Sequence, residues 1–218
     1  MRRFLICFLL CCVALWLRAD WRAILAKEAT LRKRDDRIFV TIDRALKSEA
    51  QATTEDAPYL QLYTTCLLAE GIWQFGYRRS YSENENDLPD LNAPAQSWTR
   101  QQVNRWLKQR MDAALEHAAL FARQPWERFP VFQNSGEPRW PNQSILYAFQ
   151  TIALRMSWGN EEKARFLQRL SAIAQAVDDE MLEGCIAVKL LSLAHPYNGR
   201  SWVVEMRKRI VALRESKA

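Results

Sequence analysis

Apolar residues recur every three or four positions along most of this 218-residue chain, which is the spacing of an amphipathic helix. Polar stretches that contain Pro or Gly separate the apolar segments. The predicted helices cover residues 23–50, 57–75, 99–123 and 142–156, and further helices begin at Asn160, Asp179 and Ser201. The pattern predicts an all-α fold, an irregular multi-helix bundle of about six or seven helices preceded by an N-terminal apolar anchor helix.

Local signals mark several helix ends. Thr99 and Gln102 match a capping box, and Asp56 is expected to cap the helix over 57–75. The helix that begins at Asp179 is apolar on most sides and is therefore expected to be central. A solenoid of helical hairpins is the rival architecture. However, the roughly 34-residue tetratricopeptide pattern does not fall into register on this chain, and no other fixed period appears.

The first residues form a separate unit. Arg2 and Arg3 precede an apolar run over residues 4–17, which is typical of a membrane anchor or a cleaved secretory signal. Such a run reaches about 21 Å as a helix, so a span would be short or tilted, with Trp16 and Trp21 at the interface. We divide the chain into an anchor or signal segment (1–20), a charged, solvated helical stalk leading into the domain (21–50) and an all-α globular domain (51–218).

The leader predicts a single-pass protein of the bacterial inner membrane. A short leader with two arginines is the common design for export, which favours a domain on the periplasmic side. The basic residues between 18 and 37 favour the cytoplasmic side by the positive-inside rule. Secretion after cleavage of the signal is the third alternative.

The net charge of +6 is concentrated near the leader and in the last segment. Basic residues beside a membrane segment commonly meet anionic lipid headgroups. The same residues do not interleave with aromatics in a recognised nucleic-acid-binding module. Anionic lipid is therefore a candidate partner, and nucleic acid is not expected.

No motif in the chain specifies a reaction, a metal or a cofactor. His117 beside Glu116 and the acids of 178–183 have catalytic chemistry, but a boundary histidine and acids at a helix N-terminus are the favoured interpretation. We predict no catalytic residue, no metal, no cofactor and no enzymatic activity. Cys66 and Cys185 form either one disulfide or two separate buried thiols.

The stretch 125–140 carries the candidate binding residues. Its prolines stiffen a loop that holds large aromatic and arginine side chains, the types that dominate interaction hot spots. The predicted contact residues are Trp126, Arg128, Phe129, Phe132, Arg139 and Trp140. The alternative is that the loop folds onto the bundle and buries its aromatics as core.

These features predict a membrane-anchored envelope protein that acts by protein–protein binding, as an accessory, scaffold or immunity-like subunit of a membrane-associated assembly. Its expected partners are the membrane, through the N-terminal segment, and another protein. One alternative is a membrane-tethered hydrolase or transferase that uses His117 with nearby acids. The other is a peripheral domain that binds anionic lipid surfaces through the basic stalk and the C-terminal helix.

Overall fold

The computed structural model describes residues 20–34, 37–75, 88–122, 124, 143–193 and 201–215. These residues form nine α-helices, one short 3-10 helix and no strand. The elements are α2 (Trp21–Arg34), α3 (Ile38–Ala50), α4 (Ala57–Phe75), η1 (Ala95–Ser97), α5 (Arg100–Leu115), α6 (Ala118–Phe121), α7 (Tyr147–Arg155), α8 (Asn160–Ala176), α9 (Glu180–Leu193) and α10 (Ser201–Glu215). The all-α prediction is confirmed, whereas the predicted anchor helix lies outside the described residues.

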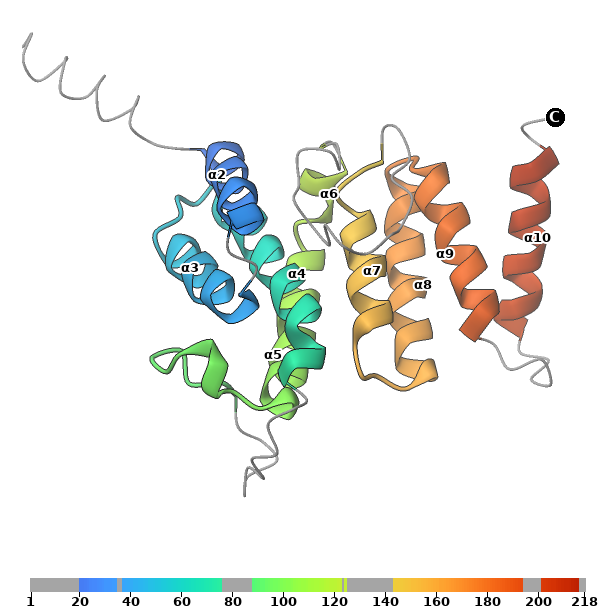
Figure 1. Ribbon diagram of the computed structural model, residues 1–218. Coiled ribbons are helices and arrows are strands. Elements are labelled where there is room, and N and C mark those ends of the chain that lie inside the picture. The colour runs from blue at the N-terminus through green and yellow to red at the C-terminus, as the bar shows by residue number, and fades with distance from the viewer. Residues whose placement is uncertain are drawn as a thin grey trace, which may run out of the picture.

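The helices form an array in which neighbours in sequence are largely neighbours in space (Figure 1). α2 and α3 lie at one end, and α9 and α10 lie at the other. α3 packs on α4, α4 contacts both α5 and α7, and α8, α9 and α10 follow in order. The irregular array is therefore built from pairs of adjacent helices rather than from a closed bundle around one axis.

The centre of the array is formed by α4 and α7. In α4, 14 of the 19 residues are buried, and every residue of α7 from Tyr147 to Ala153 is buried. The helix at 179–193 was expected to be central, and this prediction is wrong. Met181 and Val188 on α9 are 41% and 56% exposed. The sequence of α9 places apolar residues on most sides of the helix, but other helices pack against it on fewer sides than against α4.

Two long predicted helices are each divided in the structure, which accounts for nine α-helices among the described residues instead of the seven predicted. The stretch 23–50 becomes α2 and α3, and the stretch 99–123 becomes α5 and α6. Neither break contains Gly or Pro. At the second break His117 leaves the helical conformation, with φ −99° and ψ 12°. Phe121 then lies in the core, with its ring centroid 5.5 Å from that of Tyr59.

A capping box and a glycine position the middle of the array. The Gln102 amide donates to Thr99 Oγ1 at 3.2 Å and the Thr99 amide donates to Gln102 Oε1 at 2.9 Å, so the predicted box is confirmed. Gly71 on α4 lies against α3, where an added Cβ would be 3.3 Å from Ile38 Cγ1. The missing side chain at Gly71 therefore allows α3 to approach α4 closely.

The helix α2 packs on the array, where a solvated stalk was predicted. Trp21 and Glu28 are 4% exposed and Leu25 is fully buried. Trp21 was expected at a membrane interface, but its ring stacks on Tyr59 with centroids 4.2 Å apart. On α2, Arg22 and Lys27 are exposed and Glu28 is paired with Arg44, so the charge of these residues does not prevent docking. Among the helices of the described residues, none is both long enough and apolar enough to cross a membrane.

Candidate functional site

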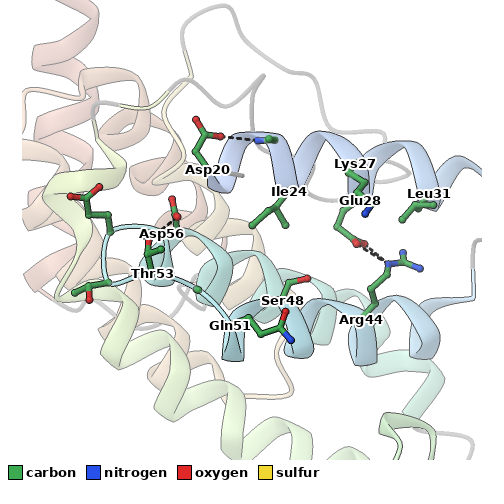
Figure 2. A pocket seen from close by; sticks show the side chains of 14 residues that line it. Asp20, Ile24, Lys27, Glu28, Leu31, Arg44, Ser48, Gln51, Thr53 and Asp56 are labelled. Atoms are coloured by element: carbon green, nitrogen blue, oxygen red, sulfur yellow. Dashed lines mark hydrogen bonds and ion pairs between the residues drawn. The ribbon is translucent and has the colours of Figure 1, made fainter. Parts of the chain in front are cut away.

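A groove of about 1220 Å³ lies between α2, α3 and the turn that leads into α4 (Figure 2). In Figure 2 the two helices lie side by side, and Ile24 and Leu31 of α2 point into the space between them. The lining residues are Asp20, Ala23, Ile24, Lys27, Glu28, Leu31, Arg44, Ser48, Gln51, Ala52, Thr53, Thr54, Glu55 and Asp56.

Two aspartates hold the N-terminal end of α2. Asp20 caps the helix, because its Oδ1 accepts the Ala23 amide at 2.9 Å. Asp56 Oδ1 accepts the Trp21 amide at 3.0 Å, and its Oδ2 accepts the Thr53 hydroxyl at 2.7 Å. Asp56 was predicted to cap α4, but its side chain instead joins the turn after α3 to the start of α2. The groove is therefore closed at this end by side chains with defined partners.

Aromatic stacking against α4 also holds the N-terminal end of α2. The Trp21 and Tyr59 rings are nearly parallel, at 10°, and the Arg22 guanidinium lies over Trp21 at 4.6 Å. Arg22 Nη2 also donates to Gln124 Oε1 at 3.2 Å. Burial raises the pKa of Tyr59 above its ordinary value, and the nearby Arg22 charge opposes this rise. The start of α2 is thus tied to α4 and to Gln124.

A buried ion pair joins the two walls further along. Arg44 Nε on α3 donates to both carboxylate oxygens of Glu28 on α2, at 2.7 and 2.8 Å. The Glu28 side chain is 5% exposed and the Arg44 side chain is 29% exposed. A charge-assisted contact of this kind restricts the distance between the helices. The width of the groove is therefore defined in the absence of a ligand.

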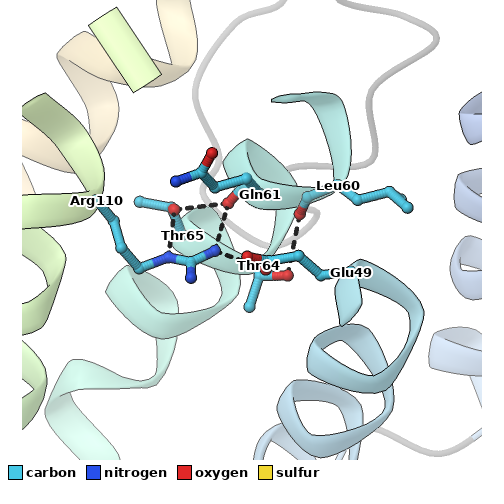
Figure 3. Close-up of polar contacts among 6 residues, drawn as sticks. All are labelled: Glu49, Leu60, Gln61, Thr64, Thr65 and Arg110. Carbon is cyan, nitrogen blue, oxygen red and sulfur yellow. Dashed lines mark hydrogen bonds and ion pairs between the residues drawn. The ribbon is translucent and has the colours of Figure 1, made fainter. Parts of the chain in front are cut away.

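A second polar cluster fixes α3 on its other side (Figure 3). Arg110 on α5 is 6% exposed and donates to Glu49 Oε2 on α3 at 2.6 Å. It also donates to Thr65 Oγ1 at 3.0 Å and to the Gln61 carbonyl at 2.9 Å, both on α4. One guanidinium therefore connects α3, α4 and α5. Because α3 is a wall of the groove, this cluster supports the groove without lining it.

The two walls differ in their apolar content. The α2 wall contributes Ala23, Ile24 and Leu31 among its charged residues, whereas α3 and the following turn contribute four hydroxyl or amide side chains, three charged side chains and one alanine. Lys27 and Glu55 are exposed charges at the rim. In the part of the chain that the structure describes, neither forms an ion pair or a hydrogen bond. The groove therefore offers apolar contact, polar contact and two available charges of opposite sign.

The predicted aromatic contact residues Trp126, Arg128, Phe129, Phe132, Arg139 and Trp140 all lie outside the described residues. This set therefore stays a prediction. The groove was not found from the sequence. Spacings such as 24 and 31 on α2, or 44, 48 and 51 on α3, mark one face of a helix, but they do not reveal whether that face is covered.

The groups with catalytic chemistry have structural contacts. His117 is half-buried at the junction of α5 and α6, and Glu116 beside it is exposed. Asp179 accepts the Leu182 amide at 3.0 Å and the Ser144 hydroxyl at 2.6 Å, so it caps α9 as a helix-start acid does. Glu183 accepts from Gln175 and Arg209. The contacts of these acids are those of helix ends and helix packing.

Metal and thiol chemistry give no further site among the described residues. No group of three or more His, Cys, Asp or Glu side chains in these residues is arranged to hold a metal ion. No disulfide joins Cys66 to Cys185, so of the two alternatives the structure adopts separate thiols. Searches of protein-family models, curated proteins and solved structures give no match to this chain. The functional argument therefore depends on the groove.

Proposed function

We propose that the protein is a membrane-anchored binding protein whose α2–α3 groove receives a segment of another protein. The apolar run over 4–17 keeps the chain at the membrane, and the helical array presents the groove. The protein thereby serves as an accessory, scaffold or immunity-like subunit of a membrane-associated assembly. The groove itself, with its 14 lining residues, is the observation that carries this proposal.

The rigidity of the walls supports binding. Asp56 and Tyr59 hold the start of α2, and the Glu28–Arg44 ion pair holds its middle against α3. A preformed groove binds with a smaller entropy cost than one that must first be ordered. Asp20, Glu28 and Asp56 are engaged with backbone amides or with arginine, which favours a binding role over proton transfer by these three groups.

The position of the groove in the chain supports a partner at the membrane. α2 begins at Trp21, directly after the apolar run and its flanking Arg18 and Asp20. A segment anchored through 4–17 would hold the groove close to the bilayer, where a second membrane protein is present at a high effective concentration.

Protease protection of a C-terminal tag in intact spheroplasts tests on which side of the membrane the helical domain lies. We expect digestion from outside, with the tag in the membrane fraction, and a protected tag would place the domain in the cytoplasm.

Photo-crosslinking tests the binding function. Full-length protein with a photoreactive phenylalanine analogue at Ser48 is expected to give a discrete adduct in cells. The same analogue at Ala172, an exposed position of α8, is the matched control. An Ile24→Arg substitution places a charge on the apolar wall and is expected to remove the adduct. An adduct pattern at Ser48 equal to that at Ala172 would contradict the proposal.

The aromatic stretch is tested with the same reporter. A variant with Trp126→Ala and Trp140→Ala is expected to lose binding if these residues contact the partner, as the sequence predicts. Loss of the Ser48 adduct in a folded double variant would join the two surfaces in one interface. An unchanged adduct would remove the aromatic residues from the contact set and leave the groove as the binding site.

A further inference from the structure

We infer that the occupant of the groove is an amphipathic α-helix of about three turns, oriented by a cation and an anion about six residues apart on the two flanks of its apolar stripe. This inference rests on the proposed function and specifies the class of partner. It is argued from the shape of the walls, from their unequal polarity and from the positions of the two available charges.

Each wall is one face of a helix. Asp20, Ile24, Lys27 and Leu31 on α2 and Arg44, Ser48 and Gln51 on α3 recur at intervals of three and four residues. Such residues form a line along the helix axis. The groove therefore runs along α2, and Asp20 to Leu31 spans about 16 Å at 1.5 Å per residue. A channel between two helices with this length accepts a third helix of about 11 residues.

The walls require an amphipathic occupant. Ala23, Ile24 and Leu31 of α2 are apolar, so the helix that binds must place an apolar stripe against them. Ser48 and Gln51 on the opposite wall need hydrogen-bonding partners, because a polar group that is buried without one is destabilising. A helix that was apolar all round would leave these groups unpaired. A helix with one apolar stripe and one polar flank satisfies both walls.

The two available charges lie at different positions along the groove. Asp56 binds the Trp21 amide, so the backbone of its neighbour Glu55 lies near the start of α2. Lys27 is six residues beyond Trp21, which corresponds to about 9 Å along the helix. An occupant with a cation facing Glu55 and an anion facing Lys27 therefore carries the two charges about six residues apart, at i and i+6. Residues with this spacing lie about 120° apart around a helix, which matches the positions of Glu55 and Lys27 on opposite walls. Two cations or two anions at these positions would each produce one repulsive contact.

The test uses two synthetic 14-residue helical peptides with the same leucine stripe. The first has Lys and Glu at positions i and i+6, one on each flank of the stripe, and the second has Lys at both positions. Binding of each labelled peptide to full-length protein held in an amphipol is measured by fluorescence anisotropy. Binding to the apolar-wall variant Ile24→Arg gives the background. Lys47→Glu, an exposed charge change on α3 outside the lining, is the matched control for charge.

We expect the native protein to prefer the Lys/Glu peptide by roughly fivefold, the ratio for exchanging an exposed attractive pair for a repulsive one. Lys27→Glu should reverse this preference toward the Lys/Lys peptide, whereas Lys47→Glu should leave it unchanged. Equal binding of the two peptides, no reversal in Lys27→Glu, or no binding above the Ile24→Arg background would overturn the inference. A groove covered by a second copy, detected as a dimer by light scattering, would overturn it as well.

The two experiments distinguish a failure of the helical-occupant inference from a failure of the proposed binding function. If Ser48 crosslinks a partner in cells but the peptides show no charge preference, the groove binds protein and the helical occupant is wrong. If Ser48 gives no adduct beyond the Ala172 control, the proposed function itself is contradicted.

Discussion

The replacement of Arg110 by Met tests how the groove wall is supported. Arg110 is buried, and its guanidinium contacts Glu49, Thr65 and the Gln61 carbonyl, with its carbon lying 4.7 Å from the centroid of the Trp106 ring. Met keeps much of the apolar volume of the arginine stem but removes every donor. The substitution therefore isolates the polar contribution of this cluster, which joins α3, α4 and α5.

The expected loss follows from the burial of the partner. Removing one member of a buried ion pair costs about 3–5 kcal/mol, because the other charge stays behind. The Glu49 side chain is 20% exposed, so water compensates it in part and the loss should lie at the lower end. We expect about 3 kcal/mol in the free energy of unfolding, which is a factor of roughly 150 in the equilibrium constant.

The assay is urea unfolding of the full-length protein, followed by tryptophan fluorescence. At a slope of roughly 2 kcal/mol per molar urea, the midpoint should fall by about 1.5 M. Arg169→Met is the matched control, because its ion pair with Asp112 is exposed, with side chains 58% and 45% accessible. This control should lose less than about 1 kcal/mol.

A double substitution tests whether the Arg110–Glu49 ion pair accounts for the loss of stability. Glu49→Gln combined with Arg110→Met should cost less than the sum of the single changes by about 2 kcal/mol, because the second change removes the charge that the first leaves unpaired. Additive losses, or a loss for Arg110→Met no larger than that for Arg169→Met, would refute this account of the cluster.

Three further predictions concern the helices around the groove. Trp21→Ala should remove the stack on Tyr59 and reduce amide-exchange protection over α2 while α5 stays protected, which hydrogen exchange by mass spectrometry measures. Gly71→Val should cost about 1–3 kcal/mol, because its side chain overlaps Ile38, and urea unfolding against Gly159→Val, whose added Cβ meets nothing within 4 Å, checks it. Because the pKa of Tyr59 is raised in the folded state, its phenol ionises at lower pH in the unfolded chain. The contribution of neutral Tyr59 to the free energy of unfolding is therefore complete below pH 10 and is lost as the pH rises beyond it. Tyr59→Phe should remove that part of the alkaline loss, and unfolding at pH 9 and 10.5 shows whether it does.

Local chemistry in the sequence determined the helical class and several helix starts. The Thr99–Gln102 box forms as predicted, and Asp179 caps α9, because both contacts involve residues three apart in the chain. The boundaries of α4 likewise agree with the apolar stretch between two polar segments, at Ala57–Phe75. Features of this kind depend on residues that are close in sequence, so they can be predicted from the sequence alone.

Other features depended on partners far away in the chain. Asp56 was free by local rules to cap α4, but the Trp21 amide, 35 residues earlier, takes its carboxylate. The charged stretch after the leader resembles a solvated stalk until Trp21 meets Tyr59 and Glu28 meets Arg44. Both contacts bury groups that local sequence gives no reason to bury.

The groove is the clearest case of what only the tertiary structure decided. Helical spacing determined which residues of α2 and α3 share a face, since 3.6 residues per turn fixes that relation within each helix. Whether the two faces meet or stay apart depends on the buried Glu28–Arg44 pair and on α3 being held to α4 and α5 by Arg110. Contacts between residues far apart in the chain set the distance between two helices. The spacing of apolar residues along the chain does not predict that distance.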